Sequence, residues 1–253
     1  TSLPAERLGL IKRGKLKKSF YADICVFDPQ KIKNNCDLKN LKTYHGCCVT
    51  FSDAEILEAQ KKISATVGIF VEPASATAYA GFMKEKEKIQ HLYKSNLYLS
   101  LCFSGVGFSF INTLLSTEGA SSTLLNADVP YSKYSLVNHY YLKEPFISNI
   151  NTTKICQLLH DEYSKVVDKD VNREKSQLLA ISCLGSIKTI NNKKGNHHTW
   201  ISFQSNSNAR HIYINLEKNL RSRIDEDLII KSILIDSVYE FINKKGFDKT
   251  KPD

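Results

Sequence analysis

The sequence has no apolar run that approaches the roughly 18 residues needed to cross a membrane. It also lacks the opening pattern of a secretory signal, in which a basic segment is followed by an apolar one. We therefore expect no membrane partner.

The seven cysteines show no C-x-x-C spacing, and their number is odd. This pattern predicts neither a zinc site nor a disulfide framework. Several cysteines have apolar neighbours, as in Ile24-Cys25-Val26, where a free cysteine behaves as a small buried apolar residue. Such usage favours a reducing compartment, so we expect a cytoplasmic protein. The adjacent His197 and His198 predict no metal site, because neighbouring side chains on a strand point to opposite faces.

Acidic residues are fewer than basic ones, 26 against 35, which gives a formal net charge of +9. The basic residues lie in short groups scattered along the chain, among them 12–18, 84–94 and 244–251. A nucleic-acid surface needs such residues on one face, interleaved with aromatic side chains. The scattered pattern does not favour a nucleic-acid partner. Whether the chain forms a homo-oligomer stays open.

From Leu97 onward the hydrophobic pattern alternates between strand and helix periods. Strands are predicted at residues 97–103, 178–183, 199–204 and 211–216, a turn or short strand at 122–126, and helices at 108–115, 152–166 and 225–242. The last strand alternates strictly, so we expect an edge or half-exposed strand there. Helices alternating with strands predict an α/β fold, in which helices pack on a layered sheet.

The opening residues 1–47 contain TSLPAERLGL and RGKLKKSFYADICVFDP, with a strand predicted at 22–27. This stretch resembles the C-terminal end of D-aminoacylases, of the amidohydrolase superfamily. The metal-binding histidines of that family lie upstream of the matching piece, so the resemblance implies ancestry and no metal site. We interpret residues 1–47 as a remnant that is too short to form a stable core alone.

Residues 48–96 begin with a capping box, Ser52 followed by Glu55, and predict a helix that stops at Gly68. A short strand at 69–71 and a second helix opening with Pro73 complete a small strand-plus-helical-hairpin extension before the α/β domain.

The string SDAEILEAQ followed by GIFVEPASA, within residues 49–84, resembles a late segment of threonine synthase, a pyridoxal-phosphate enzyme. In that family the lysine and the phosphate loop that hold the cofactor precede this segment, so we expect no cofactor. Residues 84–94 predict a charged helical linker into the main domain.

Two glycine turns flank the predicted helix 108–115. The first glycine turn is residues 104–107 (SGVG), and the second is residues 119–122 (GASS). Glycine and alanine leave room for backbone to approach a ligand, and serine supplies hydrogen-bond donors. The same residues also form ordinary loops and helix caps.

Further motifs follow the two turns: VPYS at 129–132, KGNH at 194–197, and a stretch from Leu216 to Arg223. With them, residues 97–243 resemble the CinA C-terminal family, whose bacterial members are nicotinamide mononucleotide deamidases, in its divergent branch. The resemblance implies a CinA C-terminal-like α/β domain over residues 97–243. We expect it to fold independently, followed by a basic tail at 244–253.

The resemblance also implies a site. Its catalytic residues would be Ser121 as nucleophile and Tyr131. Its ligand-binding residues would be Ser104, Gly105, Gly107, Lys194, Arg221 and Arg223. The family's first-turn serine falls on Cys102 or Ser104, an ambiguous alignment, and its lysine falls on Leu136.

We expect Ser121, Tyr131 and Arg221 to line one pocket with the first glycine turn, at the carboxyl edge of the sheet. A serine without an adjacent base is a weak nucleophile, so the missing lysine leaves activity open. Whether Arg221 and Arg223 meet an anion or pair with the acidic residues 225–227 also stays open.

Two functions follow. The first is a nucleotide-binding CinA-like domain, with a small-molecule nucleotide as partner, that is a weak amidohydrolase of the deamidase type or an inactive relative. The alternative is a mosaic of enzyme remnants that acts as a structural or interaction module without catalysis.

Overall fold

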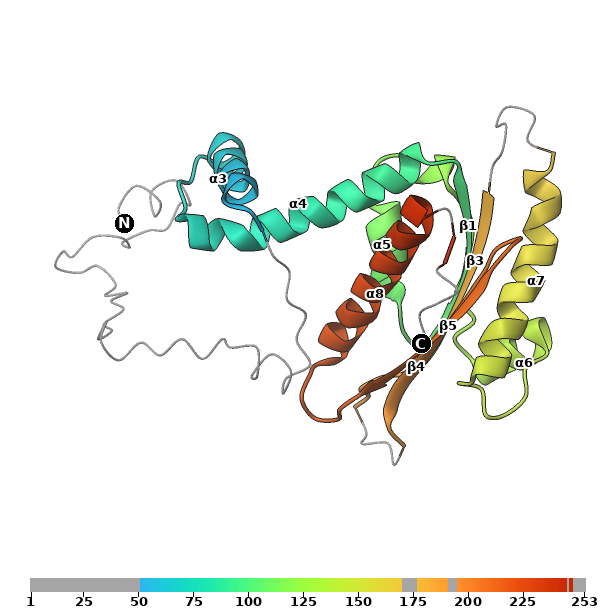
Figure 1. Cartoon of the computed structure of the whole chain (residues 1–253). Coiled ribbons are helices and arrows are strands. Elements are labelled where there is room, and N and C mark those ends of the chain that lie inside the picture. Colours follow the sequence, from blue (N-terminus) through green and yellow to red (C-terminus); the bar gives the residue numbers. More distant parts are fainter. Residues whose placement is uncertain (1–50, 170–176, 191–194, 245, 248–253) are drawn as a thin grey trace. The chain divides into compact units, whose positions relative to one another are not determined.

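The structure is a computed structural model that describes residues 51–169, 177–190, 195–244 and 246–247 (Figure 1). The chain divides into two compact units, Thr1–Met83 and Lys84–Asp253. The predicted remnant 1–47 lies outside the described residues.

The helices are α3 (Asp53–Val67), α4 (Pro73–Lys94), α5 (Phe108–Leu115), α6 (Lys133–Tyr140), α7 (Asn149–Val167), α8 (Arg223–Lys244) and the 3-10 helix η1 (Ala120–Ser122). The strands are β1 (Leu97–Ser104), β2 (Leu124–Asp128), β3 (Gln177–Ser186), β4 (His197–Gln204) and β5 (Ala209–Leu216).

The first unit contains α3 and the beginning of α4. The predicted capping box is confirmed: the backbone N–H of Glu55 donates to Ser52 Oγ, and the Glu55 carboxylate accepts from the backbone N–H of Ser52 at 2.7 Å. Gly68 ends α3 in the left-handed conformation. The two helices share a small buried cluster of alanines, Ala59, Ala76 and Ala80.

The strand predicted at 69–71 is wrong, because these residues form the connection between α3 and α4. Their apolar side chains resemble a strand in sequence, but the described part of this unit has no strand to pair with. Instead the Gln60 side chain donates to the backbone oxygen of Val71 at 2.5 Å and ties the connection to α3.

The second unit is an α/β domain built on one five-stranded sheet, in the order β2-β1-β3-β4-β5. Strand β1 runs parallel to β2 and β3, whereas β4 and β5 are antiparallel to their neighbours. The prediction of a layered sheet with helices on it is confirmed, and β5 is an edge strand as expected. We call the end of the sheet where β1, β2 and β3 finish the carboxyl edge, and the opposite end the amino edge.

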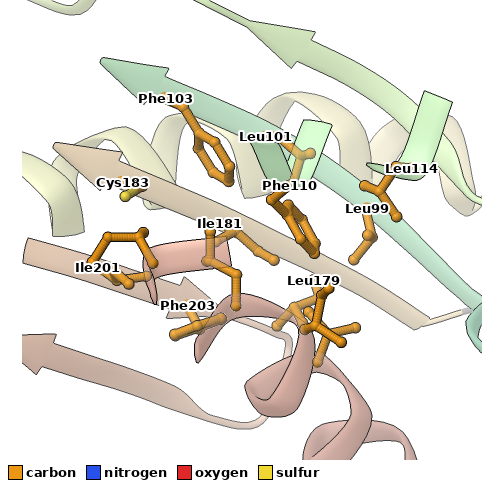
Figure 2. Close-up of a cluster of buried hydrophobic side chains, with 14 of the residues drawn as sticks. Leu99, Leu101, Phe103, Phe110, Leu114, Leu179, Ile181, Cys183, Ile201 and Phe203 are labelled. Atoms are coloured by element: carbon orange, nitrogen blue, oxygen red, sulfur yellow. The ribbon is translucent and has the colours of Figure 1, made fainter. Parts of the chain in front are cut away.

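Helices cover both faces of this sheet (Figure 1). On the α8 face, α5 and α8 pack on alternate strand residues such as Leu101, Phe103 and Ile181, which are fully buried (Figure 2). On the α7 face, α6 and α7 pack on the intervening residues, among them Cys102 and Ala180. Each large side chain buried this way contributes about 1.5–3 kcal/mol, so both layers are held by ordinary core packing.

The segment 84–94 is part of the domain and not only a linker. Ile89 and Leu92 are buried in the α8-face core. Lys231 of α8 bonds to Glu85 at 2.8 Å. The division between the units therefore falls before Lys84, inside α4, earlier than the expected boundary after residue 96.

Part of the predicted basic tail also joins this core. Phe247 is buried, with its ring 5.2 Å from that of Phe203 and 5.0 Å from that of Phe241. Within the described residues, every helix is too short or too polar to cross a membrane.

The connection from β1 to β2 decides where the two glycine turns lie. Strand β1 ends at the carboxyl edge in the first glycine turn, and α5 then returns the chain to the amino edge. There the second glycine turn forms η1, and Ser122 Oγ bonds to the backbone oxygen of Tyr93, just before β1. Strand β2 then runs back alongside β1. Of the two glycine turns, only the first therefore lies at the carboxyl edge, together with the residues after β2.

Candidate functional site

A cavity of about 240 Å³ lies at the carboxyl edge, beside the ends of β1 and β3. Its lining is contributed by these strand ends, by residues in and around α6, and by the first residue of α8. The lining residues are Ser104, Gly105, Tyr131, Leu136, Phe146, Ile147, Leu184, Gly185, Ser186, Ile187, Thr189 and Arg223. The volume is slightly below the roughly 300–1,000 Å³ of typical ligand pockets, so it suits one small ring with its substituents.

The cavity has an apolar wall and a polar rim. Leu136, Phe146 and Leu184 form the apolar part, while hydroxyls and one guanidinium, that of Arg223, supply the donors. Such a lining binds a flat apolar group and orients it by a few polar contacts.

Two glycines bring the ends of β1 and β3 together beneath the cavity. Gly105 has φ +83°, and a Cβ there would lie 2.0 Å from the backbone oxygen of Gly185. A Cβ on Gly185 would meet Val106 and Thr199 at about the same closeness, 2.4 and 2.5 Å. Glycine is required at Gly105 because backbone packs directly on backbone there, and at Gly185 because the side chains of Val106 and Thr199 occupy the place of a Cβ. The space that these glycines were expected to leave for a ligand is occupied by the packing of β1 against β3.

The amino end of α5 is occupied by a carboxylate of the protein itself. Asp227 of α8 is buried and accepts hydrogen bonds from the backbone N–H groups of Gly107, Phe108 and Ser109, the last at 2.8 Å. A helix amino terminus favours an anion, and here Asp227 is that anion. The backbone N–H of Gly107 therefore binds Asp227 and not a ligand, and Gly107 does not line the cavity.

Arg223 is held at the mouth of the cavity by neutral oxygens. It donates to the backbone oxygens of Lys188 at 2.8 Å and Gly105 at 2.9 Å, and to the Tyr131 hydroxyl at 3.5 Å. Among the described residues it forms no ion pair with a carboxylate. Its charge thus remains available to an anionic ligand.

The acidic residues that follow Arg223 are engaged elsewhere. Asp225 accepts from the Ser222 hydroxyl at 2.6 Å. Glu226, fully buried, accepts from the Lys188 backbone N–H and is bonded to His197 Nδ1, both at 2.7 Å. These contacts hold the segment 187–189 of the cavity wall against α8.

Arg221 does not line the cavity and belongs electrostatically to the start of α8. Hydrogen bonds from Ser222 lower the pKa of Asp225, and the positive charge of Arg221 adds to that effect. The question whether the two arginines meet an anion or the acidic residues 225–227 therefore has a different answer for each. Arg221 acts on the acidic start of α8, whereas Arg223 reaches the cavity.

Ser104 and Tyr131 both line the cavity. Ser104 is buried, and its hydroxyl donates to the backbone oxygen of Pro130 at 2.7 Å. Tyr131 is 66% exposed at the rim, with its ring 6.1 Å from that of Phe108. The structure thus brings Ser104, Gly105, Tyr131 and Arg223 together.

Ser121 is not brought to this group. It lies exposed in η1 at the amino edge, and the whole of β2 separates it from Tyr131. Four strand steps from Leu124 to Asp128 span about 13 Å. The expectation that Ser121 shares a pocket with the first glycine turn is wrong, because α5 carries the chain back to the opposite edge.

Two other expected positions can be located. Leu136, where the family's lysine would fall, lines the cavity with an apolar side chain. Cys102, the alternative to Ser104, is fully buried outside the lining, and burial raises the pKa of its thiol to about 12. Such a thiol stays protonated and unreactive at neutral pH. Lys194 lies outside the described residues.

The cavity lining contains no carboxylate, histidine, lysine or cysteine. Elsewhere in the described ranges, no three histidine, cysteine or acidic side chains gather as a metal site would require. The arrangement can therefore bind and orient a ligand, but it offers Ser104 no base that would take its proton.

The sequence reasoning missed the contribution of β3 to this site. Leu184 and Ser186 line the cavity because β3 is parallel to β1 and ends beside it. Neighbouring parallel strands meet their ligands at the same edge, so the Gly-Ser at the end of β3 was an available signal.

Sequence profiles of known protein families give no match to the chain. A threonine synthase from Synechocystis sp. is 50% identical over 38 residues, which cover 15% of this chain and 10% of that enzyme. The chain thus spans about a tenth of the length of this curated relative.

Solved structures similar to this chain are CinA superfamily proteins. One from Klebsiella pneumoniae 700603 is 9% identical, with a TM-score of 0.48 over 64% of this chain and 97% of that protein. One from Enterobacter cloacae is 12% identical, with a TM-score of 0.45 over 63% and 89%. The competence/damage inducible protein CihA from Agrobacterium tumefaciens is 10% identical, with a TM-score of 0.43 over 78% and 98%.

Proposed function

We propose that the second unit is a nucleotide-binding domain of the CinA-like type, which binds a small anionic ligand with a planar ring and does not hydrolyse it. Nicotinamide mononucleotide is the ligand that the motifs of the sequence suggest. The observation that carries the proposal is the cavity at the carboxyl edge, where Ser104, Tyr131 and Arg223 meet an apolar wall.

The lining supports a ligand with two unlike ends. Arg223 has no carboxylate partner among the described residues, so a ligand phosphate would gain a charge-assisted hydrogen bond of about 1.5–3 kcal/mol. The flat, apolar end would lie against Phe146 and Leu184. The exposed Tyr131 hydroxyl, only 3.5 Å from the guanidinium, can move aside for the anion.

The same lining supports binding without turnover. Amide hydrolysis needs a nucleophile, a base for its proton and donors for the oxyanion. Leu136 stands where a lysine would be needed, and Ser121 lies at the opposite edge. The N–H groups of α5 that could stabilise an oxyanion already bond to Asp227.

The test is a thermal-shift titration of the full chain with nicotinamide mononucleotide. A ligand at 100 times its dissociation constant stabilises the protein by about 2.7 kcal/mol, so the melting temperature should rise measurably. Arg223→Ala should abolish the shift. Arg221→Ala, which removes the same charge two residues away and outside the lining, should retain it.

Chromatography of the incubated nucleotide should show no deamidated product. Release of nicotinic acid mononucleotide would contradict the claim that the site lacks turnover. A wild-type protein that no mononucleotide stabilises would contradict the binding function and favour the structural or interaction module.

A further inference from the structure

A row of aromatic side chains continues the cavity wall across the sheet. Leu184 and Ser186 of β3 line the cavity, and in the antiparallel register they pair directly with Trp200 and His198 of β4. Trp200 in turn pairs with Tyr213 of β5. Directly paired residues point to the same face of a sheet. The aromatic strip, defined as His198, Trp200 and Tyr213, therefore lies on the same face as the cavity wall and beside it.

The rings of the aromatic strip form one surface. The ring centroids of Trp200 and Tyr213 are 4.9 Å apart, and those of His198 and Tyr213 are 6.1 Å apart, with interplanar angles of 46° and 42°. Tyr213 is 50% exposed, and His198 and Trp200 are half-buried. A cross-strand aromatic pair alone stabilises a sheet, but that role does not require an exposed ring next to a cavity.

Helix α7 covers the next residues along the same strands and leaves the strip accessible. Ser202 donates to Thr152 of α7 at 2.8 Å, and His211 lies 3.4 Å from Thr153 Oγ1. Ser202 and His211 form the next pair after Trp200 and Tyr213 on this face, further from the carboxyl edge. The cover of α7 thus reaches the pair behind the strip, while Tyr213 stays half exposed.

We propose that the ligand of the cavity carries a second planar ring, which stacks on the aromatic strip, so that the ligand class is a dinucleotide: two bases joined through a pyrophosphate. The inference rests on the proposed function of the cavity. Neighbouring strands are about 4.8 Å apart, which puts Tyr213 two strands, or about 10 Å, from Leu184. One ring in the cavity cannot also cover Tyr213, whereas a ligand with two linked rings can occupy both places.

The charges around the strip favour a dinucleotide over a single-stranded nucleic acid. A groove for a nucleic-acid strand needs a row of cations along its backbone path. Arg210 of β5 lies on the opposite face, where it bonds to Glu240 of α8 at 3.0 Å. Among the described residues of the cavity and the strip, Arg223 is the single lysine or arginine, which suits one short anionic linker.

Fluorescence tests the inference directly, because Trp200 is the only tryptophan of the chain. The full chain is titrated with oxidised nicotinamide adenine dinucleotide and, separately, with nicotinamide mononucleotide, and the affinities are also measured by calorimetry. The dinucleotide should quench Trp200 emission saturably. Stacking of one base should make it bind roughly 5- to 140-fold more tightly than the mononucleotide.

Tyr213→Ala should remove this gain and leave the affinity for the mononucleotide unchanged. Tyr213→Leu, which keeps apolar bulk on β5 for folding but has no ring, should lose the same factor. Tyr134→Ala removes a tyrosine that is 74% exposed on α6 outside the cavity lining, and it should change neither affinity.

Each contrary result has a distinct meaning. If the mononucleotide binds but the dinucleotide gains nothing through Tyr213, the strip is not a ring site, and the proposed function stands. If neither nucleotide binds, both proposals fall. If a ten-nucleotide oligothymidine binds more tightly than the dinucleotide and depends on Tyr213, the strip serves single-stranded nucleic acid and the dinucleotide assignment is overturned.

Discussion

The two glycine turns, SGVG and GASS, both combine glycine with serine, yet they lie at opposite edges of the sheet. The first, residues 104–107, lies at the carboxyl edge, where Gly105 packs on the backbone of Gly185 and lines the cavity. The second, residues 119–122, lies at the amino edge, where Gly119 packs on the ring of Tyr93. Small residues and hydroxyls therefore indicate a tight turn, but the direction of the neighbouring elements decides which edge it reaches.

The difference also concerns what each turn packs against. A Cβ on Gly105 would meet a backbone oxygen at 2.0 Å, and a backbone oxygen cannot move without shifting β3. A Cβ on Gly119 would meet Tyr93 Cδ2 at 2.9 Å, and a ring can tilt. The turn at the cavity is thus the less tolerant one.

The largest expected effect comes from placing alanine in each turn. Gly105→Ala should lower the free energy of unfolding by about 4 kcal/mol, because left-handed backbone and a clash with Gly185 add together. Gly119→Ala should lower it by about 2 kcal/mol, mainly through its positive φ. Urea unfolding of both variants measures the two values.

Nucleotide-induced thermal shifts add a second reading to this pair. Gly119→Ala should keep the shift, because its turn is at the other edge, and Gly105→Ala should lose it even where the variant is still folded. Equal costs for the two variants would show that the turns are equivalent and would remove the contrast between the edges.

The next effect concerns the carboxylate that occupies the amino end of α5. Asp227→Ala would leave the backbone N–H groups of Gly107, Phe108 and Ser109 without their acceptor and should cost about 3 kcal/mol of unfolding free energy. Asp227→Asn, which keeps one acceptor oxygen, should cost less. Added phosphate should recover part of the loss in the alanine variant, since the helix end then offers an anion site.

A loss below about 0.5 kcal/mol for Asp227→Ala, the range of a neutral surface change, would mean that water replaces the carboxylate without cost. The amino end of α5, at the first glycine turn, would then be open to an external anion. Arg223 would no longer differ from it as a place where a ligand anion can bind at the carboxyl edge.

Much of the fold could be predicted from periodicity. The strands β1, β3, β4 and β5 and the helices α5, α7 and α8 follow the predicted ranges, since their apolar residues recur at the period of each element. Helix α6 was not predicted, because KYSLVNHY has little apolar periodicity and its cap at Ser132 is its main signal. In residues 84–94, the dense charges obscured the buried Ile89 and Leu92, which are three residues apart on one helix face.

The candidate site could be predicted only in part. Ser104 ends β1, Tyr131 follows β2 and Arg223 begins α8, and the fold gathers all three at the cavity. The prediction for Ser121 is wrong because a residue that follows a crossover helix lies at the start of the next parallel strand, at the amino edge. The walls from β3 and the aromatic strip depend on the pairing register, which no local pattern of residues specifies.

Serine-to-alanine changes in the two turns should give a smaller contrast of the same kind. Ser104→Ala removes a hydroxyl that donates to Pro130 inside the cavity wall and should cost about 1 kcal/mol of stability. Ser121→Ala changes an exposed residue and should stay within about 0.5 kcal/mol of wild type. Urea unfolding of the two variants measures both changes in the free energy of unfolding. A larger loss for Ser121→Ala than for Ser104→Ala would show that the second turn is the more constrained one.

The smallest expected effect is an acid-sensitive contact near the amino edge, where Glu240 meets Lys244 at 2.9 Å and Arg210 at 3.0 Å. The hydrogen bonds from Lys244 and Arg210 lower the pKa of Glu240 below its ordinary value. A carboxylate whose pKa is lowered in the folded state stabilises the protein at pH values above its unfolded-state pKa, near 4.3. This stabilisation is lost as the pH falls through the folded-state pKa. Because the pair is partly exposed to solvent, the gain is only about 0.5 kcal/mol. Glu240→Gln should therefore cost that amount at neutral pH, and the cost should disappear as the pH falls through the lowered folded-state pKa, below which wild type is also protonated. The carboxyl edge holds Arg223 on neutral oxygens, so Arg223→Ala should show no such change of cost over the same range. A cost of Glu240→Gln that persists at low pH would mean that the side chain acts through packing and not through its charge.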